Sequence, residues 1–179
     1  MPLPLGHTAI GLATYETAQN NDHDYSRWGT FALITVLANL PDVDILAGLL
    51  FHGNGNFFHR GPTHSLLFAV MAGYAASHLW RLWDRIPRLG FPLCFGLIFS
   101  HVLADMLFTS SPVSLFWPFQ LFFSPGFSGW ENVMHTVLYQ SIRDGGIIAA
   151  CVLYIGLLRV LRGVFKGERA PALIQRRRP

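Results

Sequence analysis

Four long apolar stretches restrict the folds open to this chain. They cover residues 28–51, 63–83, 90–109 and 145–161, and each is close to the ~20 apolar residues that a membrane-spanning helix needs. Charged residues make up only 13% of the 179 residues, about half the share usual in soluble domains. A fifth, shorter apolar segment at 3–17 either spans or lies buried among the others. We therefore expect an all-α, polytopic membrane bundle of four to five transmembrane or membrane-embedded helices.

The basic residues predict how this bundle is oriented. Arg81 lies at the end of the second stretch, Arg85 and Arg88 lie between the second and third stretches, and a second basic group follows the fourth. Basic residues concentrate in cytoplasmic loops, so we expect one membrane-embedded domain over residues 1–166 and a basic cytoplasmic tail over 167–179. Because these residues flank apolar segments and form no basic face, lipid is the expected partner and nucleic acid is not. The sequence does not tell whether the chain has a protein partner.

Asp42 and Asp44 interrupt the first long stretch, in the run NLPDVD at 39–44. Each carboxylate costs about 2.5–3.5 kcal/mol at the centre of a membrane, so two of them need a reason. Pro41 disfavours helix at the preceding residue and suits the first position of a new helix. A backbone break here would let both carboxylates turn towards one point. Helix capping by Asp42, or a short outer loop, is the structural alternative.

The run HRGPTHS at 59–65 is the most informative motif in the sequence. Its Gly-Pro pair predicts a helix start, with His64 in the first turn and His59 in the preceding loop, from which it can fold back. The amides at this helix start and the Arg60 guanidinium suit an anion such as phosphate. Two hydroxyl side chains could orient the imidazoles: Thr63 and Ser65. A polar outer loop whose histidines face water is the alternative.

His101 and Asp105 lie towards the outer end of the third stretch, four residues apart, and so share one helical face. A hydrogen bond within the helix would also explain this pair. His7 begins the short first segment, where a lone histidine is more often a core residue than a ligand. Glu131 and His135, also four apart, are additional candidates on spacing alone.

Under the predicted topology, seven ligand-type residues from four segments fall at a similar depth near the outer side of the membrane. They are His7, Asp42, Asp44, His59, His64, His101 and Asp105. Imidazole and carboxylate ligands suit zinc, manganese or iron, and seven are enough for two ions if one aspartate bridges. We expect one or two divalent ions, with zinc favoured over manganese or iron.

This ordered set resembles the YdjM-like family of bacterial inner-membrane proteins, which are predicted metal-dependent hydrolases. The resemblance rests on His7, the PDVD motif at 41–44, the HRGPTHS run, and His101 with Asp105. It covers roughly the first two-thirds of the chain and implies a metal-dependent hydrolase of the inner membrane. A stretch at 115–119, LFWPF, is also similar to a tryptophan–proline element of the family. The resemblance does not extend to Glu131 and His135.

The expected activity is hydrolysis of a phosphoester or phosphoanhydride in a lipid or lipid-linked small molecule, by metal-activated water. Asp44 or Asp105 would accept a proton or bridge the ions, and Arg60 would stabilise the developing oxyanion. The main alternative is a non-catalytic metal-binding protein or a cation or proton transporter. Transport predicts polar residues through the inner half of the helices, and that half is almost entirely apolar. A cluster that only joins the helices is the third reading, and it predicts that removing a ligand abolishes folding.

Overall fold

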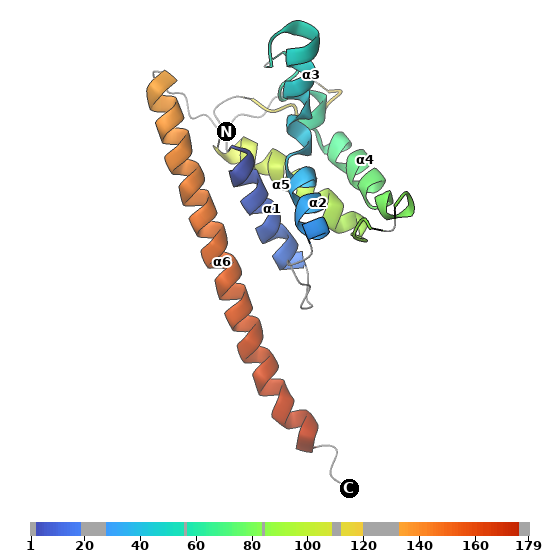
Figure 1. The fold of residues 1–179 in the computed structure, drawn as a ribbon, viewed down its shortest axis with the longest axis vertical. Helices are drawn as coiled ribbons and strands as arrows, with labels where there is room; N and C mark the ends of the chain where they lie inside the picture. The colour runs from blue at the N-terminus through green and yellow to red at the C-terminus, as the bar shows by residue number, and fades with distance from the viewer. Residues whose placement is uncertain are drawn as a thin grey trace.

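This computed structural model describes residues 3–18, 28–55, 57–83, 85–108, 112–119 and 133–175, with the backbone alone for 133–141 and 165–175. Over these residues the regular elements are all helical, as predicted (Figure 1). In chain order they are α1 (Pro4–Ala18), α2 (Trp28–Ala38), the 3-10 turn η1 (Leu40–Asp42), α3 (Val43–His52), the turn η2 (Pro62–His64), α4 (Leu66–Ala76), the turn η3 (Leu79–Arg81), α5 (Phe91–Phe108) and α6 (Val133–Gln175).

Fewer helices than predicted are long enough to cross a membrane. By length and composition, two in the described residues qualify, α5 and the stretch Ile142–Val164 of α6. The pair α2 and α3 is a third only if it counts as one span, because its two helices are bent by 57°. The stretch 63–83 differs most from the prediction. Its α-helix, α4, has 11 residues, or ~16 Å, about half of a ~30 Å hydrocarbon core.

The short helix α1 lies among the other helices. For the segment 3–17, the sequence had left open whether it spans the membrane or lies buried in this way. It packs against α2, α5 and α6. Its approach to α2 depends on Gly11, because a Cβ atom at that position would lie 2.7 Å from the Cβ of Ala38. Gly73 likewise allows the close approach of α4 and α5, because a Cβ at this position would lie 2.9 Å from the backbone of Phe95.

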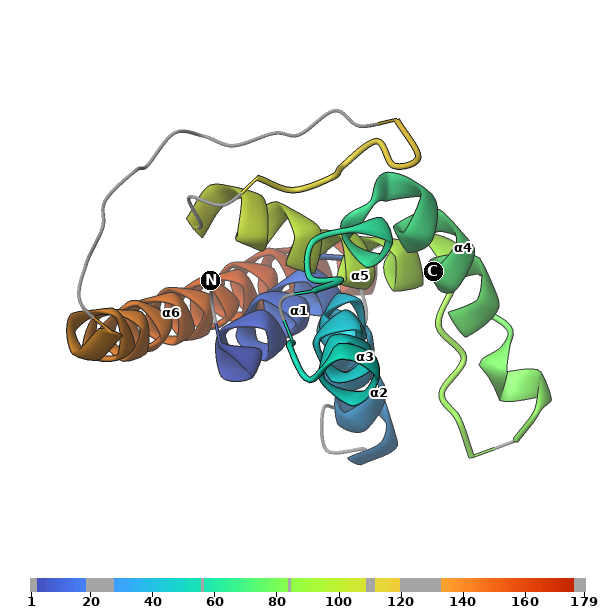
Figure 2. The ribbon, with the colours of Figure 1, turned by 90° about the horizontal axis from the view of Figure 1, so that it is seen from above.

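Helix α6 runs along the outside of the bundle beside α1, with α4 on the far side (Figures 1 and 2). At one end, the carboxylate of Asp144 accepts from the backbone N–H of Leu3 at 2.9 Å and of Gly6 at 3.3 Å. At the other end, Arg159 donates to the Glu16 carboxylate at 3.1 Å. The two helices are therefore parallel. Because α6 continues to Gln175, most of the predicted tail 167–179 is helical.

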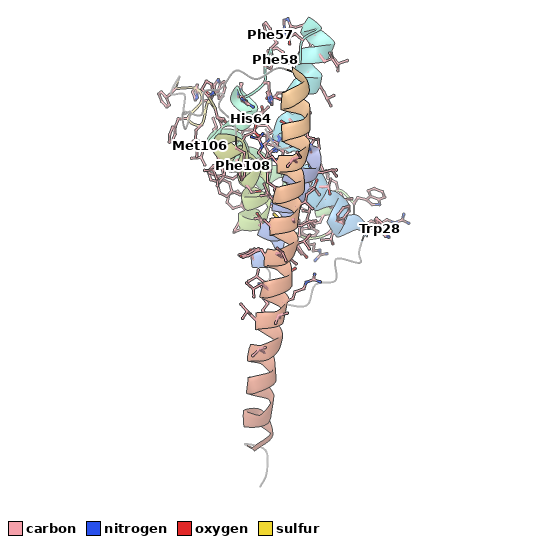
Figure 3. All side chains as sticks on the ribbon, turned by 90° about the vertical axis from the view of Figure 1, so that its left-hand side faces the viewer. Trp28, Phe57, Phe58, His64, Met106 and Phe108 are labelled. Atoms are coloured by element: carbon pink, nitrogen blue, oxygen red, sulfur yellow. The ribbon has the colours of Figure 1, made fainter. Side chains whose placement is uncertain are left out.

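The two ends of the bundle differ in chemistry. The start of α2 lies beside a basic segment, since a Cβ at Gly29 would lie 3.7 Å from the carbonyl oxygen of Arg85, and α5 begins just after Arg88. Histidines and aspartates gather at the opposite end, where α1 begins, α5 ends and α2 meets α3. Figure 3 shows His64 near that end, and Trp28, the first residue of α2, at a lower level.

Candidate metal centre

The predicted backbone break at Pro41 is confirmed, and it brings two aspartates into the same end of the bundle. Pro41 is the middle residue of the turn η1, after which α3 leaves at a new angle. Asp42 ends this turn and Asp44 lies in the first turn of α3. The side chain of Asp44 is only 2% exposed and that of Asp42 17%. A buried carboxylate needs compensating donors or cations, and the two residues meet this need differently.

Asp44 is surrounded by hydrogen-bond donors from the loop before α4. His59 folds back, as predicted, and its Nδ1 lies 3.2 Å from Asp44 Oδ1. The Thr63 hydroxyl donates to Oδ2 at 2.6 Å, and the backbone N–H of Arg60 donates to the same oxygen at 3.2 Å. Arg60 is held in the left-handed region, at φ 66°, which is rare for a residue other than glycine and is found at functional sites.

His101 and Asp105 do not pair with each other within α5. His101 Nδ1 donates to the carbonyl oxygen of Ala38 at 2.7 Å, which leaves the lone pair of Nε2 free to bind an ion. Asp105 turns its two oxygens to different partners, with Oδ1 at 3.4 Å from His7 Nε2 and Oδ2 at 3.5 Å from His64 Nε2. Both side chains are almost fully buried.

Four residues place one ligand atom each around a common point: Asp42, His64, His101 and Asp105, whose ligand atoms all lie within 4.8 Å of one another. His101 Nε2 is 3.4 Å from Asp42 Oδ1, and His64 Nε2 is 3.7 Å from the same oxygen. Two ligands each about 2.1 Å from a tetrahedral zinc ion are separated by ~3.4 Å. The observed separations therefore fit shared coordination better than direct hydrogen bonds.

The same atoms are buried and lack hydrogen-bond partners: Asp42 Oδ1, His64 Nε2, His101 Nε2 and both oxygens of Asp105. Leaving one buried polar group unsatisfied costs about 1–3 kcal/mol, so such a set is not retained without compensation. A divalent cation would satisfy one atom on each of the four residues at once. The donor set, two imidazoles and two carboxylates, suits zinc, manganese or iron.

His64 connects this group to the donors around Asp44. Its Nδ1 lies 3.2 Å from both Thr63 Oγ1 and Asp44 Oδ2, while its Nε2 faces the other three residues of the four-residue group. A second possible ligand set, Asp44, His59 and His64, therefore shares His64 with the first. Burial lowers the pKa of His64, but contacts with the three aspartates outweigh it and raise the pKa to about 10. The centre thus attracts a positive charge, either a proton or a metal ion.

One known protein family matches almost the whole chain. The family model described as YdjM inner membrane protein matches residues 1–168. The chain belongs to this family. The inner membrane protein YbcI of Escherichia coli (strain K12) is 38% identical over 96 residues, which are 50% of this chain and 55% of that protein. The chain thus spans about half the length of this curated relative. No solved structure matches the chain.

Several predicted residues in this YdjM-family chain lie elsewhere or have another contact. His7 lies outside the two compact ligand sets, although its ring stacks on His101 at 3.7 Å between centroids. Ser65 was expected to orient an imidazole, but its hydroxyl donates to Pro62 O and accepts from the Phe68 N–H, and so caps α4. Glu131 and the side chain of His135 lie outside what the structure describes.

The predicted anion site at the start of the helix also changes. The N–H of Leu66 donates to Leu115 O at 2.9 Å and that of Phe68 to Ser65 Oγ at 3.1 Å. These two amides at the start of α4 are therefore occupied, and at the predicted helix start, which is the 3-10 turn η2, the N–H of His64 donates to Gly61 O at 3.2 Å. The Arg60 guanidinium lies beside the four-residue group: its Nε is buried without a hydrogen-bond partner, 3.7 Å from Asp105 Oδ2.

Sequence reasoning missed two supports of the candidate centre in this YdjM-family chain. The carbonyl group of Ala38, which orients His101, belongs to the backbone. Every residue has such a group, so no sequence motif identifies it. Asn39 donates to Thr8 Oγ1 at 3.1 Å and to Thr35 O at 2.8 Å, and so ties α1 to the break between α2 and α3. Its polarity inside an apolar run was the available signal.

Proposed function

We propose that this inner membrane protein is a metal-dependent hydrolase of a phosphoester or phosphoanhydride in a lipid or lipid-linked substrate. The observation that carries the proposal is the set of buried ligand atoms without hydrogen-bond partners on Asp42, His64, His101 and Asp105. A divalent ion bound by these four residues would hold a water molecule as a fifth ligand, as zinc does when it expands its coordination, and would lower the pKa of that water to ~7, which supplies a hydroxide nucleophile. Zinc is the expected ion, with manganese or iron as alternatives.

Arg60 is the residue best placed to bind the substrate anion. It is held by the Asp44 carboxylate through its own N–H, and its carbonyl oxygen accepts from Ser114 N at 3.3 Å. The backbone is thus fixed on both sides, so the guanidinium is positioned beside Asp105 before substrate arrives. A positioned guanidinium stabilises charge that develops on phosphoryl oxygens.

Exposed aromatic and aliphatic side chains beside the centre favour a lipid substrate. The segment 112–119 hydrogen-bonds to Arg60 and Leu66 and exposes Phe116, Trp117 and Phe119 by 41%, 42% and 71%. On the α3 side, Phe57 and Phe58 lie above His64 (Figure 3) and are also exposed. Rings at this density suit the headgroup level of a bilayer, where a lipid phosphate would meet the centre.

The residues beneath the centre argue against the conduction of ions or protons. Leu37, Leu97 and Ile98 are each at most 2% exposed and belong to one apolar core cluster. Leu97 precedes His101 by one helical turn, so this core begins directly below the ligands. A pathway for ions or protons requires polar groups or water at that depth.

The test is metal analysis of detergent-purified protein together with hydrolysis of a phospholipid and of bis(p-nitrophenyl) phosphate. We expect bound metal and hydrolysis that a chelator abolishes. His101→Ala should remove both, and His78→Ala is the matched control, because His78 lies at the far end of α4 against Tyr74 O. Metal-loaded wild-type protein that cleaves neither substrate would refute the hydrolase proposal, and metal flux into vesicles would favour transport.

We further propose that the centre faces the outer side of the inner membrane and that the C-terminus is cytoplasmic. The basic residues Arg85 and Arg88, and the Arg159–Glu16 pair, lie at the end opposite the histidine and aspartate cluster. Basic ends favour the cytoplasm. Green fluorescent protein fused to the C-terminus should fluoresce and alkaline phosphatase at the same place should be inactive. The reverse result would invert the orientation.

A further inference from the structure

We propose that Asp44 is a positioning residue that holds His64 and the loop at 59–63, and that the ion is bound by Asp42, His64, His101 and Asp105. This inference rests on the proposed metal centre and divides two aspartates that the sequence presents as equivalent. It also means that Asp44, His59 and His64 do not form a second ion site, although their ligand atoms are close enough to do so.

The first argument is the use of the Asp44 oxygens. A carboxylate has about four lone-pair sites for hydrogen bonds. Oδ1 faces His59 Nδ1, and Oδ2 faces the Thr63 hydroxyl, the Arg60 N–H and His64 Nδ1, all at 2.6–3.2 Å. The hydroxyl and the amide can donate here, and both imidazoles can place an N–H on Nδ1. The carboxylate is already satisfied by protein donors.

The second argument is the contrast with Asp42 and Asp105. The buried Oδ1 of Asp42 and both oxygens of Asp105 lack hydrogen-bond partners. The Nε2 atoms of His64 and His101 lie 3.4–3.7 Å from Asp42 Oδ1 and Asp105 Oδ2, near the ~3.4 Å expected between two ligands of one tetrahedral ion. Around Asp44 the distances are those of hydrogen bonds.

The third argument is the protonation of His64. When the ring is neutral, as a metal ligand must be, the contacts of Nδ1 with Thr63 and Asp44 place the N–H on that side, and Nε2 presents its lone pair to the ion. A carboxylate that accepts from the far nitrogen of a ligand histidine fixes its tautomer and ring orientation and raises its basicity. Asp44 therefore acts on the ion through His64.

Charge supports the same division. The three carboxylates Asp42, Asp44 and Asp105 and the guanidinium of Arg60 leave a net charge of minus two, which one divalent ion neutralises. A second divalent ion beside Asp44 would leave two uncompensated positive charges among side chains that are at most 17% exposed. Burying an uncompensated charge is costly.

The experiment compares Asp44→Asn with Asp42→Asn, the same chemical change two residues apart. Both variants are loaded with Co²⁺ in detergent, and ions per chain, affinity and the visible absorption spectrum are measured. We expect Asp44→Asn to bind as many ions per chain as the wild type, with the same band positions and an affinity about 10–100-fold lower. Asp42→Asn should shift the bands, because it replaces a ligand. Loss of one ion per chain, or an equal spectral shift, in Asp44→Asn would overturn the proposal.

Thr63 provides an independent variant in case Asp44→Asn fails to fold. Thr63→Val removes the hydroxyl that donates to Asp44 at 2.6 Å and keeps the shape of the side chain. It should weaken Co²⁺ binding without moving the bands, and Thr63→Ser should restore the affinity. Equal affinities in all three proteins would count against the proposal. These measurements do not depend on hydrolysis, so wild-type protein that binds Co²⁺ but cleaves nothing refutes only the proposed function, whereas failure to bind Co²⁺ refutes both.

Discussion

The close approach of α1 and α2 allows a test of how the metal centre is held in place. A Cβ atom at Gly11 would lie 2.7 Å from the Cβ of Ala38, whereas carbon atoms pack best at about 3.5–4.0 Å. Gly11→Ala therefore requires the two helices to separate by about 1 Å. Ala38 is fully buried, and a close-packed interior offers no space to absorb this shift.

The shift reaches the centre through one hydrogen bond. The Ala38 carbonyl accepts from His101 Nδ1 at 2.7 Å, and a working site must hold its groups within about 0.5 Å. We expect Gly11→Ala to lower the free energy of unfolding by about 1–3 kcal/mol, the usual cost of overpacking. Zinc affinity should fall by about 10-fold or more, as when the partner of a ligand histidine is disturbed.

The assay is thermal unfolding in detergent, together with the zinc dissociation constant from competition with a chromophoric chelator. Gly96→Ala is the matched control, because the nearest atom to its new Cβ would be Thr14 Cγ2 at 3.7 Å, an ordinary contact. It should keep wild-type stability and affinity. If Gly11→Ala behaves like Gly96→Ala in both measurements, the reasoning is refuted.

Two further predictions concern proton release and the attachment of α6. The pKa of His64, raised from 6.5 to about 10 in the metal-free protein, means that its stabilising contribution is complete below pH 6.5 and is lost as the pH rises through about 10. Zinc binding at neutral pH should therefore release about one proton from His64, measured calorimetrically in two buffers of different ionisation enthalpy; a heat independent of buffer would contradict this. Asp144→Ala should lower the free energy of unfolding by about 1–3 kcal/mol, because it leaves the N–H groups of Leu3 and Gly6 unpaired. Asp144→Asn keeps an acceptor oxygen and should lose less, so equal losses in the thermal unfolding of both variants would exclude the capping role.

Much of the centre could be predicted from the sequence, because ionisable residues are costly in apolar segments and so stand out there. Asp42, His64, His101 and Asp105 are such residues, and the structure brings them together. Pro41 likewise predicted the break between α2 and α3, since proline restricts the backbone on both sides. Both signals are local in the sequence, and they are easy to detect because ionisable residues are rare in the apolar segments of membrane proteins.

Helix lengths were less predictable. Apolar composition continues through 63–83, yet the α-helix covers only Leu66–Ala76, because 3-10 turns precede and follow it. Composition reports how apolar a segment is and says little about where its helical hydrogen bonds end. The same limit applies to Ser65, whose part as a helix cap depends on the backbone around it.

The sequence by itself determined that the chain is a membrane protein with ligand-type side chains from four segments, because apolar stretches and isolated ionisable residues are properties of composition and spacing. Only the tertiary structure decided which nitrogen of His64 and which aspartate face the common point. Asp42 and Asp44 look alike in the sequence, and they differ because the donors that surround Asp44 come from residues 15–19 positions later in the chain. No local pattern encodes contacts that exist only after the chain has folded.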